Sequence, residues 1–108
     1  MDISKEIEKR QVEIESVINN YMPKEEGLQK TIFSGMNYSI NAGGKRIRPM
    51  LMQETYKLFS GIGRIIEPFM ASLEMIHTYS LVHDDMPCVD NDDMRRGKPT
   101  THVAYGET

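Results

Sequence analysis

The segment "HDDMPCVDNDDMRRGKPTTH", residues 83 to 102, contains the side chains whose types and spacing best suit chemistry. Five aspartates fall within ten positions, and two arginines and a lysine follow them closely. Carboxylates crowded in this way repel one another unless cations lie between them. Two interpretations are open: a solvated acidic loop, or a site at which metal ions bring a polyanion onto acidic side chains. The aspartates are Asp84, Asp85, Asp90, Asp92 and Asp93.

Three of these aspartates, Asp84, Asp85 and Asp90, form a D-D-x-x-x-x-D pattern that suits a hard divalent cation. Magnesium usually takes one or two carboxylates and fills its other positions with water and substrate phosphates. Asp84 falls at the end of an expected helix, and Asp90 returns through the loop after Pro87, which leaves a gap for an ion. An EF-hand is excluded, because Arg95 stands where that loop requires glycine.

Two arginines directly after the acidic segment supply complementary charge. Arg95 and Arg96 carry planar guanidinium groups that match phosphate oxygens two at a time. A bound polyanion could therefore meet metal ions on one side and guanidinium groups on the other. Ion pairs from these arginines back to Asp92 or Asp93 are the alternative.

A second cationic cluster lies far upstream, in "GGKRIRP". Lys45, Arg46 and Arg48 follow two glycines, which let the backbone approach a ligand closely. Lys45 and Arg48 are three residues apart and share a face if the segment is helical. The spacing of a Walker A loop is absent. The cluster predicts a second anion site, with a helix start bearing solvated cations as the alternative.

The elements that must position these groups are expected to be helices throughout. Apolar residues at helical spacing, together with the proline and glycine positions, predict helices over residues 2–22, 24–42, 49–61 and 68–86, and another from about residue 100. Asp2 or Ser4 could cap the first helix. No segment shows the two-residue alternation of a strand. The fold class is therefore all-α.

One stripe of the fourth helix changes from apolar to polar toward the acidic segment, as a pocket wall would. Its members are Leu73, Ile76, His77, Ser80 and Asp84. His77 and Asp84 are two helical turns apart, about 10 Å. The alternative for His77 is a partly buried histidine with an ordinary hydrogen bond.

Bulk composition indicates one globular domain in a reducing compartment. The chain has 108 residues, 39% of them hydrophobic and 27% charged, and a net charge of −3, which gives no reason to expect nucleic-acid binding. Cys88 is the single cysteine, so no intrachain disulfide can form. We find no apolar run of the roughly 18 residues that span a bilayer. The first residues lack the apolar core of a signal peptide. A cytoplasmic location is expected.

In order and spacing, "GGKRIRP" and "EMIHTYSLVHDDMPCVDNDDMRRGKPTTH" resemble the trans-prenyl diphosphate synthases, most closely the bacterial farnesyl diphosphate synthases. The resemblance extends from about residue 30 to the end. It implies that residues 1–108 are the N-terminal part of a polyprenyl synthetase domain, the first helices of the isoprenoid synthase bundle. The family's second aspartate-rich motif and its C-terminal helices are not among these residues.

The resemblance also implies roles for individual residues. Asp84 and Asp90 would carry Mg²⁺, two or three ions in a complete enzyme, with Asp85 completing the motif. Arg95 would hold an allylic diphosphate. In the family, an aromatic residue at the position of Tyr79 accompanies a C15 product. The metal-free isopentenyl diphosphate site would comprise Lys45, Arg48, His77 and Arg96.

The activity implied is magnesium-dependent, head-to-tail condensation of isopentenyl diphosphate with dimethylallyl or geranyl diphosphate to farnesyl diphosphate. A homodimer or higher oligomer is expected, because apolar faces meant for further helices would be exposed. These residues alone are expected to be a fragment with little or no activity. Two other interpretations stay open: a non-catalytic partner of a complete synthase, and a metal phosphohydrolase using the His83-Asp84 pair.

Overall fold

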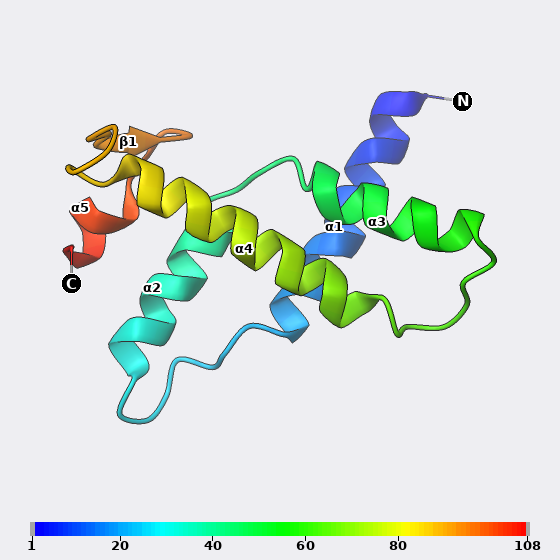
Figure 1. Ribbon diagram of the computed structural model, residues 1–108, viewed down its shortest axis with the longest axis horizontal. Helices are drawn as coiled ribbons and strands as arrows, with labels where there is room; N and C mark the ends of the chain where they lie inside the picture. The colour runs from blue at the N-terminus through cyan, green and yellow to red at the C-terminus, as the bar shows by residue number, and fades with distance from the viewer. Residues whose placement is uncertain (1, 108) are drawn as a thin grey trace. The chain divides into compact units, whose positions relative to one another are not determined.

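The chain forms five α-helices and one short β-hairpin within the residues that the computed structural model describes, 2–107 (Figure 1). These residues divide into two compact units, the first containing residues up to 22 and 45–74, the second residues 23–44 and those from 75 onward. The all-α prediction is confirmed. The elements are α1 (Ile3–Asn20), α2 (Lys30–Asn41), α3 (Ile47–Leu58), α4 (Glu67–Asp85), β1 (Met94–Arg95), β2 (Lys98–Pro99) and α5 (Thr101–Tyr105).

The first unit buries one face of α1 together with residues at the start of α4. Ile14 and Ile18, one turn apart on α1, are buried, as are Met70 and Ala71 on α4. Burying a large aliphatic side chain stabilises a fold by about 1.5–3 kcal/mol, so these few positions are the unit's main apolar contribution. As predicted, the Asp2 side chain caps α1, accepting a hydrogen bond from the Ser4 backbone N–H at 3.0 Å.

The helix predicted from residue 24 begins only at Lys30, so this boundary was wrong. Gly27 adopts a left-handed φ of +83°, and its carbonyl accepts a 3.3 Å bond from the Lys30 N–H. This turn leads directly into the first residue of α2, and Leu28 is fully exposed on it. The apolar residues spaced four apart therefore did not all belong to one buried helical face.

The prediction of helices alone missed the hairpin of β1 and β2. The strands are antiparallel, with Met94 opposite Pro99 and Arg95 opposite Lys98. Arg96 and Gly97 make the two-residue turn with φ of +52° and +77°, the handedness that suits hairpin twist. Strands of two residues are too short to show alternation, so the hydrophobic pattern gave no signal.

In the second unit, α2 supports both the hairpin and α5. The Tyr38 hydroxyl donates to the Pro99 carbonyl at 2.5 Å, and the Ser39 and Thr101 hydroxyls lie 2.7 Å apart. Thr100 is buried, and its backbone N–H and its hydroxyl bond the carbonyls of Asp93 and Asp92 at 2.9 and 2.8 Å. The acidic loop is thereby fixed at its C-terminal end.

Many large apolar side chains are exposed among the described residues. Phe59, Ile65, Phe69 and Ile76 are each more than 60% exposed. Exposed large apolar side chains of this kind are found on faces that bind partners when they gather in one patch. Between residues 2 and 107, we find no helix of the length and apolarity that crossing a membrane requires.

Candidate functional site

The loop after α4 folds back onto the helix end and returns Asp90 to Asp84, as the sequence predicted. The Asp90 N–H donates to the Asp84 carbonyl at 2.9 Å, and the Asp92 N–H to the Asp85 carbonyl at 3.0 Å. These bonds satisfy carbonyls that the helix end leaves without intrahelical partners. Asp84 and Asp90 are both exposed. Two carboxylates thus stand at one solvent-facing helix end.

Asp85 forms an ion pair with Arg95 that the sequence did not indicate. Nε and Nη2 of Arg95 each donate to a different carboxylate oxygen at 2.7 Å, and the Asp85 side chain is only 5% exposed. The bonds from Arg95 lower the pKa of the Asp85 carboxyl, against the opposing effect of burial. The same bonds raise the pKa of Arg95. These two bonds use two of the five N–H groups of the Arg95 guanidinium and fix the plane of that group.

The donor set at this helix end fits magnesium in kind, because exposed carboxylate oxygens are the ligands that Mg²⁺ prefers. Asp84 and Asp90 provide two such groups, while Asp85 is bonded to Arg95. Across the described residues, 2–107, no group of three or more His, Cys, Asp or Glu side chains is arranged to hold a metal ion. Asp84 and Asp90 would therefore hold a magnesium ion only together with ligands from outside this set.

Arg96, in the hairpin turn, bonds the glycine pair that follows α2. Its Nη1 donates to the Gly43 carbonyl at 3.0 Å within the second unit. Gly43 has a φ of +110°, a conformation that side chains rarely adopt, which explains the glycine. Gly43 precedes Lys45 by two positions in the chain. The sequence showed both motifs but gave no indication of this bond.

The three cations of the segment "GGKRIRP" differ in how far their side chains are exposed to solvent. Lys45 and Arg48 are exposed, whereas the Arg46 side chain is 1% exposed and bonded to two glutamates. Arg46 is the N-cap residue of α3 and has a φ of +59°. The sequence placed Arg46 in the predicted anion site together with Lys45 and Arg48, and it gave no indication that the side chain is buried against carboxylates.

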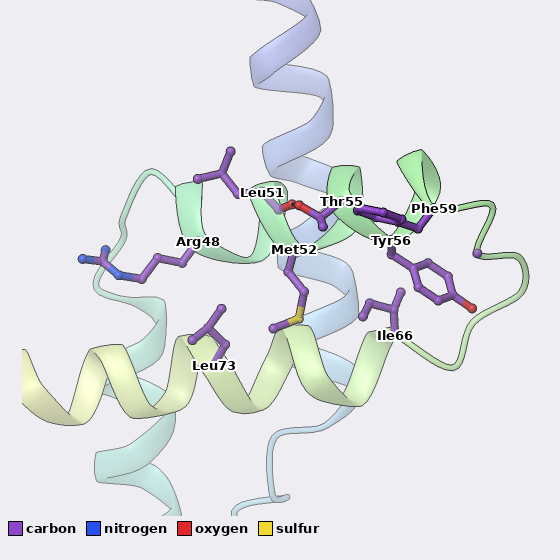
Figure 2. Close-up of a pocket in the computed structure, with 9 residues that line it drawn as sticks. Arg48, Leu51, Met52, Thr55, Tyr56, Phe59, Ile66 and Leu73 are labelled. Carbon is purple, nitrogen blue, oxygen red and sulfur yellow. Dashed lines mark hydrogen bonds between the residues drawn. The ribbon is translucent and has the colours of Figure 1, made fainter.

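Arg48 lies at one end of an apolar pocket of about 600 Å³ in the first unit (Figure 2). α3 lines the pocket with Leu51, Met52 and Tyr56, and the other side is closed by Leu73 of α4 and by Ile66, the residue directly before that helix. Figure 2 shows the Arg48 guanidinium pointing away from these apolar groups. The pocket thus has an apolar body and a cationic rim.

On α4, His77 is half-buried, and Tyr79 is 68% exposed with its ring 6.1 Å from that of His83. Ile76 and Asp84, predicted to share a stripe with His77, are exposed. Leu73 and His77 of this stripe are half-buried and Ser80 is exposed, and the role of the stripe as a pocket wall stays a prediction. The residues predicted to bind isopentenyl diphosphate divide between the units: Lys45 and Arg48 in the first, His77 and Arg96 in the second.

Sequence comparison matches residues 29–108 to a family described as Polyprenyl synthetase. The chain is 47% identical over 94 residues to the farnesyl diphosphate synthase of Geobacillus stearothermophilus, covering 87% of this chain and 31% of that protein. It is 55% identical over 76 residues to the chloroplastic geranylgeranyl pyrophosphate synthase of Catharanthus roseus, covering 70% and 21%. These relatives bear different product names, so similarity leaves the product length open.

Structural comparison gives the same family. The crystal structure of an FPP/GFPP synthase from Zymomonas mobilis superposes with a TM-score of 0.85 at 38% identity, over 96% of this chain and 37% of that one. Against these three proteins, the chain spans only 21–37% of their lengths.

Proposed function

This chain belongs to the polyprenyl synthetase family, and we propose that it forms the N-terminal diphosphate-binding part of a prenyltransferase. The reaction is two successive head-to-tail condensations of isopentenyl diphosphate, first with dimethylallyl diphosphate to give geranyl diphosphate and then with geranyl diphosphate to give farnesyl diphosphate, and each condensation releases one inorganic diphosphate. The observation on which this rests is the end of α4, where exposed Asp84 and Asp90 stand beside a hairpin bearing Arg95 and Arg96.

Asp84 and Asp90 would hold magnesium, which when bound neutralises charge on the departing diphosphate. Arg95 binds that diphosphate through the guanidinium N–H groups that Asp85 leaves available. Because Asp85 fixes the plane of the fork, Arg95 is already oriented before the ligand arrives. The allylic C–O bond breaks and its electron pair leaves with the diphosphate, so a carbocation forms.

The second substrate, isopentenyl diphosphate, requires cations but no metal. Lys45, Arg48, His77 and Arg96 are the proposed ligands of its diphosphate. The double bond of this substrate attacks the carbocation and forms the new C–C bond, and the resulting tertiary cation loses a proton to give the new double bond. We find no evident general base among the residues named here, so the released diphosphate is the proposed proton acceptor.

A C15 product is the finer part of the proposal, and it rests on Tyr79. This ring lies five residues before Asp84 and is exposed on α4, where a bulky aromatic group would limit the length of a growing isoprenoid chain. Farnesyl diphosphate is therefore preferred to the geranylgeranyl product named for the plant relative.

A chimaera tests the proposal directly. The chain replaces the matching N-terminal segment of the G. stearothermophilus farnesyl diphosphate synthase, and the product is assayed with isopentenyl and geranyl diphosphates. We expect magnesium-dependent farnesyl diphosphate synthesis that Asp84→Ala and Asp90→Ala each abolish. A folded chimaera without prenyltransferase activity would contradict the proposal. The 108-residue chain alone is the matched control and should show little or no turnover.

The location and assembly of the protein complete the proposal. We place it in the cytoplasm as a homodimer or higher oligomer, and the exposed apolar side chains support association. A non-catalytic partner of a complete synthase is the alternative function. The intact Asp84, Asp90 and Arg95 favour the catalytic assignment, because a partner without catalysis has no requirement for them.

A further inference from the structure

Arg46 is the buried centre of a three-residue ion cluster, and in the chain it stands between Lys45 and Arg48, two of the proposed isopentenyl diphosphate ligands. Its Nη1 donates to Glu74 Oε1 at 2.7 Å, its Nη2 to Glu15 Oε2 at 3.2 Å, and its Nε to Glu15 Oε1. The Arg46 and Glu74 side chains are 1% and 4% exposed. The pKa of Arg46 is raised by its bonds to Glu15 and Glu74, although burial alone would lower it. All of these residues belong to the first unit.

Arg46 adopts a backbone conformation that needs support from its surroundings. Its φ of +59° is left-handed, and residues other than glycine keep such a conformation only where neighbouring contacts determine it. A second bond acts on the same loop, from Gln11 Nε2 to the Lys45 carbonyl at 2.9 Å. Gln11 and Glu15 lie one turn apart on α1, so one face of this helix holds both Lys45 and Arg46.

These bonds hold the segment between two exposed cations, Lys45 immediately before Arg46 and Arg48 two residues after it. Phosphate ligands on a loop are effective only when their positions are fixed before binding, since ordering them afterwards lowers affinity. We propose that Arg46, held by Glu15 and Glu74, is a positioning residue that sets Lys45 and Arg48 for diphosphate. The inference rests on the proposed function, and it assigns part of the site's geometry to α1, outside the matched residues 29–108.

The decisive variant is Glu15→Gln, because two explanations predict opposite changes in its affinity for diphosphate. If only the electrostatic field around the loop matters, removing a carboxylate near Lys45 and Arg48 should tighten anion binding. If Glu15 positions the loop through Arg46, its replacement should weaken binding. Arg46→Lys keeps the charge and removes the guanidinium fork, so any loss of affinity must come from geometry.

The assay is titration calorimetry of the whole chain with inorganic diphosphate and with isopentenyl diphosphate, in EDTA and at fixed ionic strength. We expect Arg46→Lys to weaken both ligands about tenfold, and Glu15→Gln and Gln11→Ala about threefold. Arg10→Ala is the matched control. Arg10 also links α1 to α3, through Gln53 at 3.0 Å and through Glu54, and both of these bonds are to side chains of α3 rather than to the loop before it. This variant should bind within twofold of the parent.

Urea unfolding of each variant separates positioning from general loss of structure. Gln11→Ala removes one hydrogen bond without burying a charge, so it keeps the test available if Arg46→Lys does not fold. The inference is overturned, with the proposed function left standing, if Glu15→Gln binds diphosphate as tightly as the parent or more tightly. The same holds if Arg10→Ala loses as much affinity as Gln11→Ala. The proposed site and the inference are both wrong if the parent chain does not bind diphosphate, or if Lys45→Ala leaves its affinity for diphosphate unchanged.

Discussion

The pair of Asp85 and Arg95 permits a quantitative prediction by a double-mutant cycle of Asp85→Asn and Arg95→Met. Solvent-exposed ion pairs contribute about 0.2–1 kcal/mol, whereas removing one partner of a buried pair costs about 3–5 kcal/mol. Here the carboxylate is 5% exposed and the guanidinium 32%, with two bonds of 2.7 Å. The pair lies between the two limits, and we expect a coupling free energy of about 2 kcal/mol.

The assay is urea unfolding of the parent chain, both single variants and the double variant at pH 7 without metal. A chain of this size has an m-value of about 1.5 kcal/mol/M, so Asp85→Asn should lower the midpoint by roughly 1 M. The double variant should be about 2 kcal/mol more stable than the sum of the two single losses predicts. Asp93→Asn, an exposed aspartate of the same loop, is the control and should couple to Arg95 by less than about 0.5 kcal/mol. Coupling of Asp85 below that value would refute the assignment of a built, buried pair.

Three further predictions concern pH, glycine conformation and product length. Because the folded-state pKa of Asp85 is lowered, the pair stabilises the fold at pH above the unfolded carboxyl value, about 3.9, and this contribution disappears as pH falls through the lower folded value. The difference in free energy of unfolding between the parent and Asp85→Asn should therefore be constant from pH 8 to 5 and shrink below about pH 4. Urea midpoints measure this difference at each pH. A difference that grows on acidification would contradict the prediction. Gly97→Ala, at a φ of +77°, should lower the free energy of unfolding by about 1 kcal/mol, because side chains rarely adopt this conformation. Gly35→Ala, within α2 and with an ordinary 3.7 Å contact to Tyr105, should raise the free energy of unfolding by about 0.5–1 kcal/mol. Changes of the same sign in urea unfolding would refute the conformational argument. In the chimaera, Tyr79→Ala should shift products beyond C15, and an unchanged product distribution by chromatography would remove the role of Tyr79.

The sequence predicted the helical fold well where proline, glycine and apolar spacing agreed. Pro49 lies in the first turn of α3 and Pro68 at the second residue of α4, as their fixed φ favours. The error at residues 24–29 has a physical reason: Leu28 kept the helical period, but the left-handed Gly27 lies in the turn before the helix. Periodicity records where apolar residues recur, and it does not distinguish a buried position from an exposed one.

At the candidate site, the sequence predicted which residue types gather but not which partners they choose. The return of Asp90 to Asp84 was predicted from the loop that follows Pro87, and the structure confirms it. The pairing of Asp85 with Arg95 depends on the hairpin. Strands of two residues give no alternating hydrophobic pattern, so the sequence did not predict this hairpin. The partners of Arg46 come from α1 and α4, 31 and 28 residues away. Contacts so distant in the chain are decided by tertiary packing.

These pairings change how the arginines of the two motifs should be counted as phosphate ligands. Arg46 is enclosed by carboxylates, Arg95 spends two N–H groups on Asp85, and Arg96 donates to a backbone carbonyl. Arg46 and Arg96 both have left-handed φ, where a bulky side chain is unfavourable, so each is held by the contacts around it. On the proposed function, the two motifs therefore contain two kinds of arginine: those proposed to bind diphosphate, and Arg46, which is proposed to fix the backbone beside them. Substitution by lysine distinguishes them, because lysine retains the charge but cannot reproduce the planar fork.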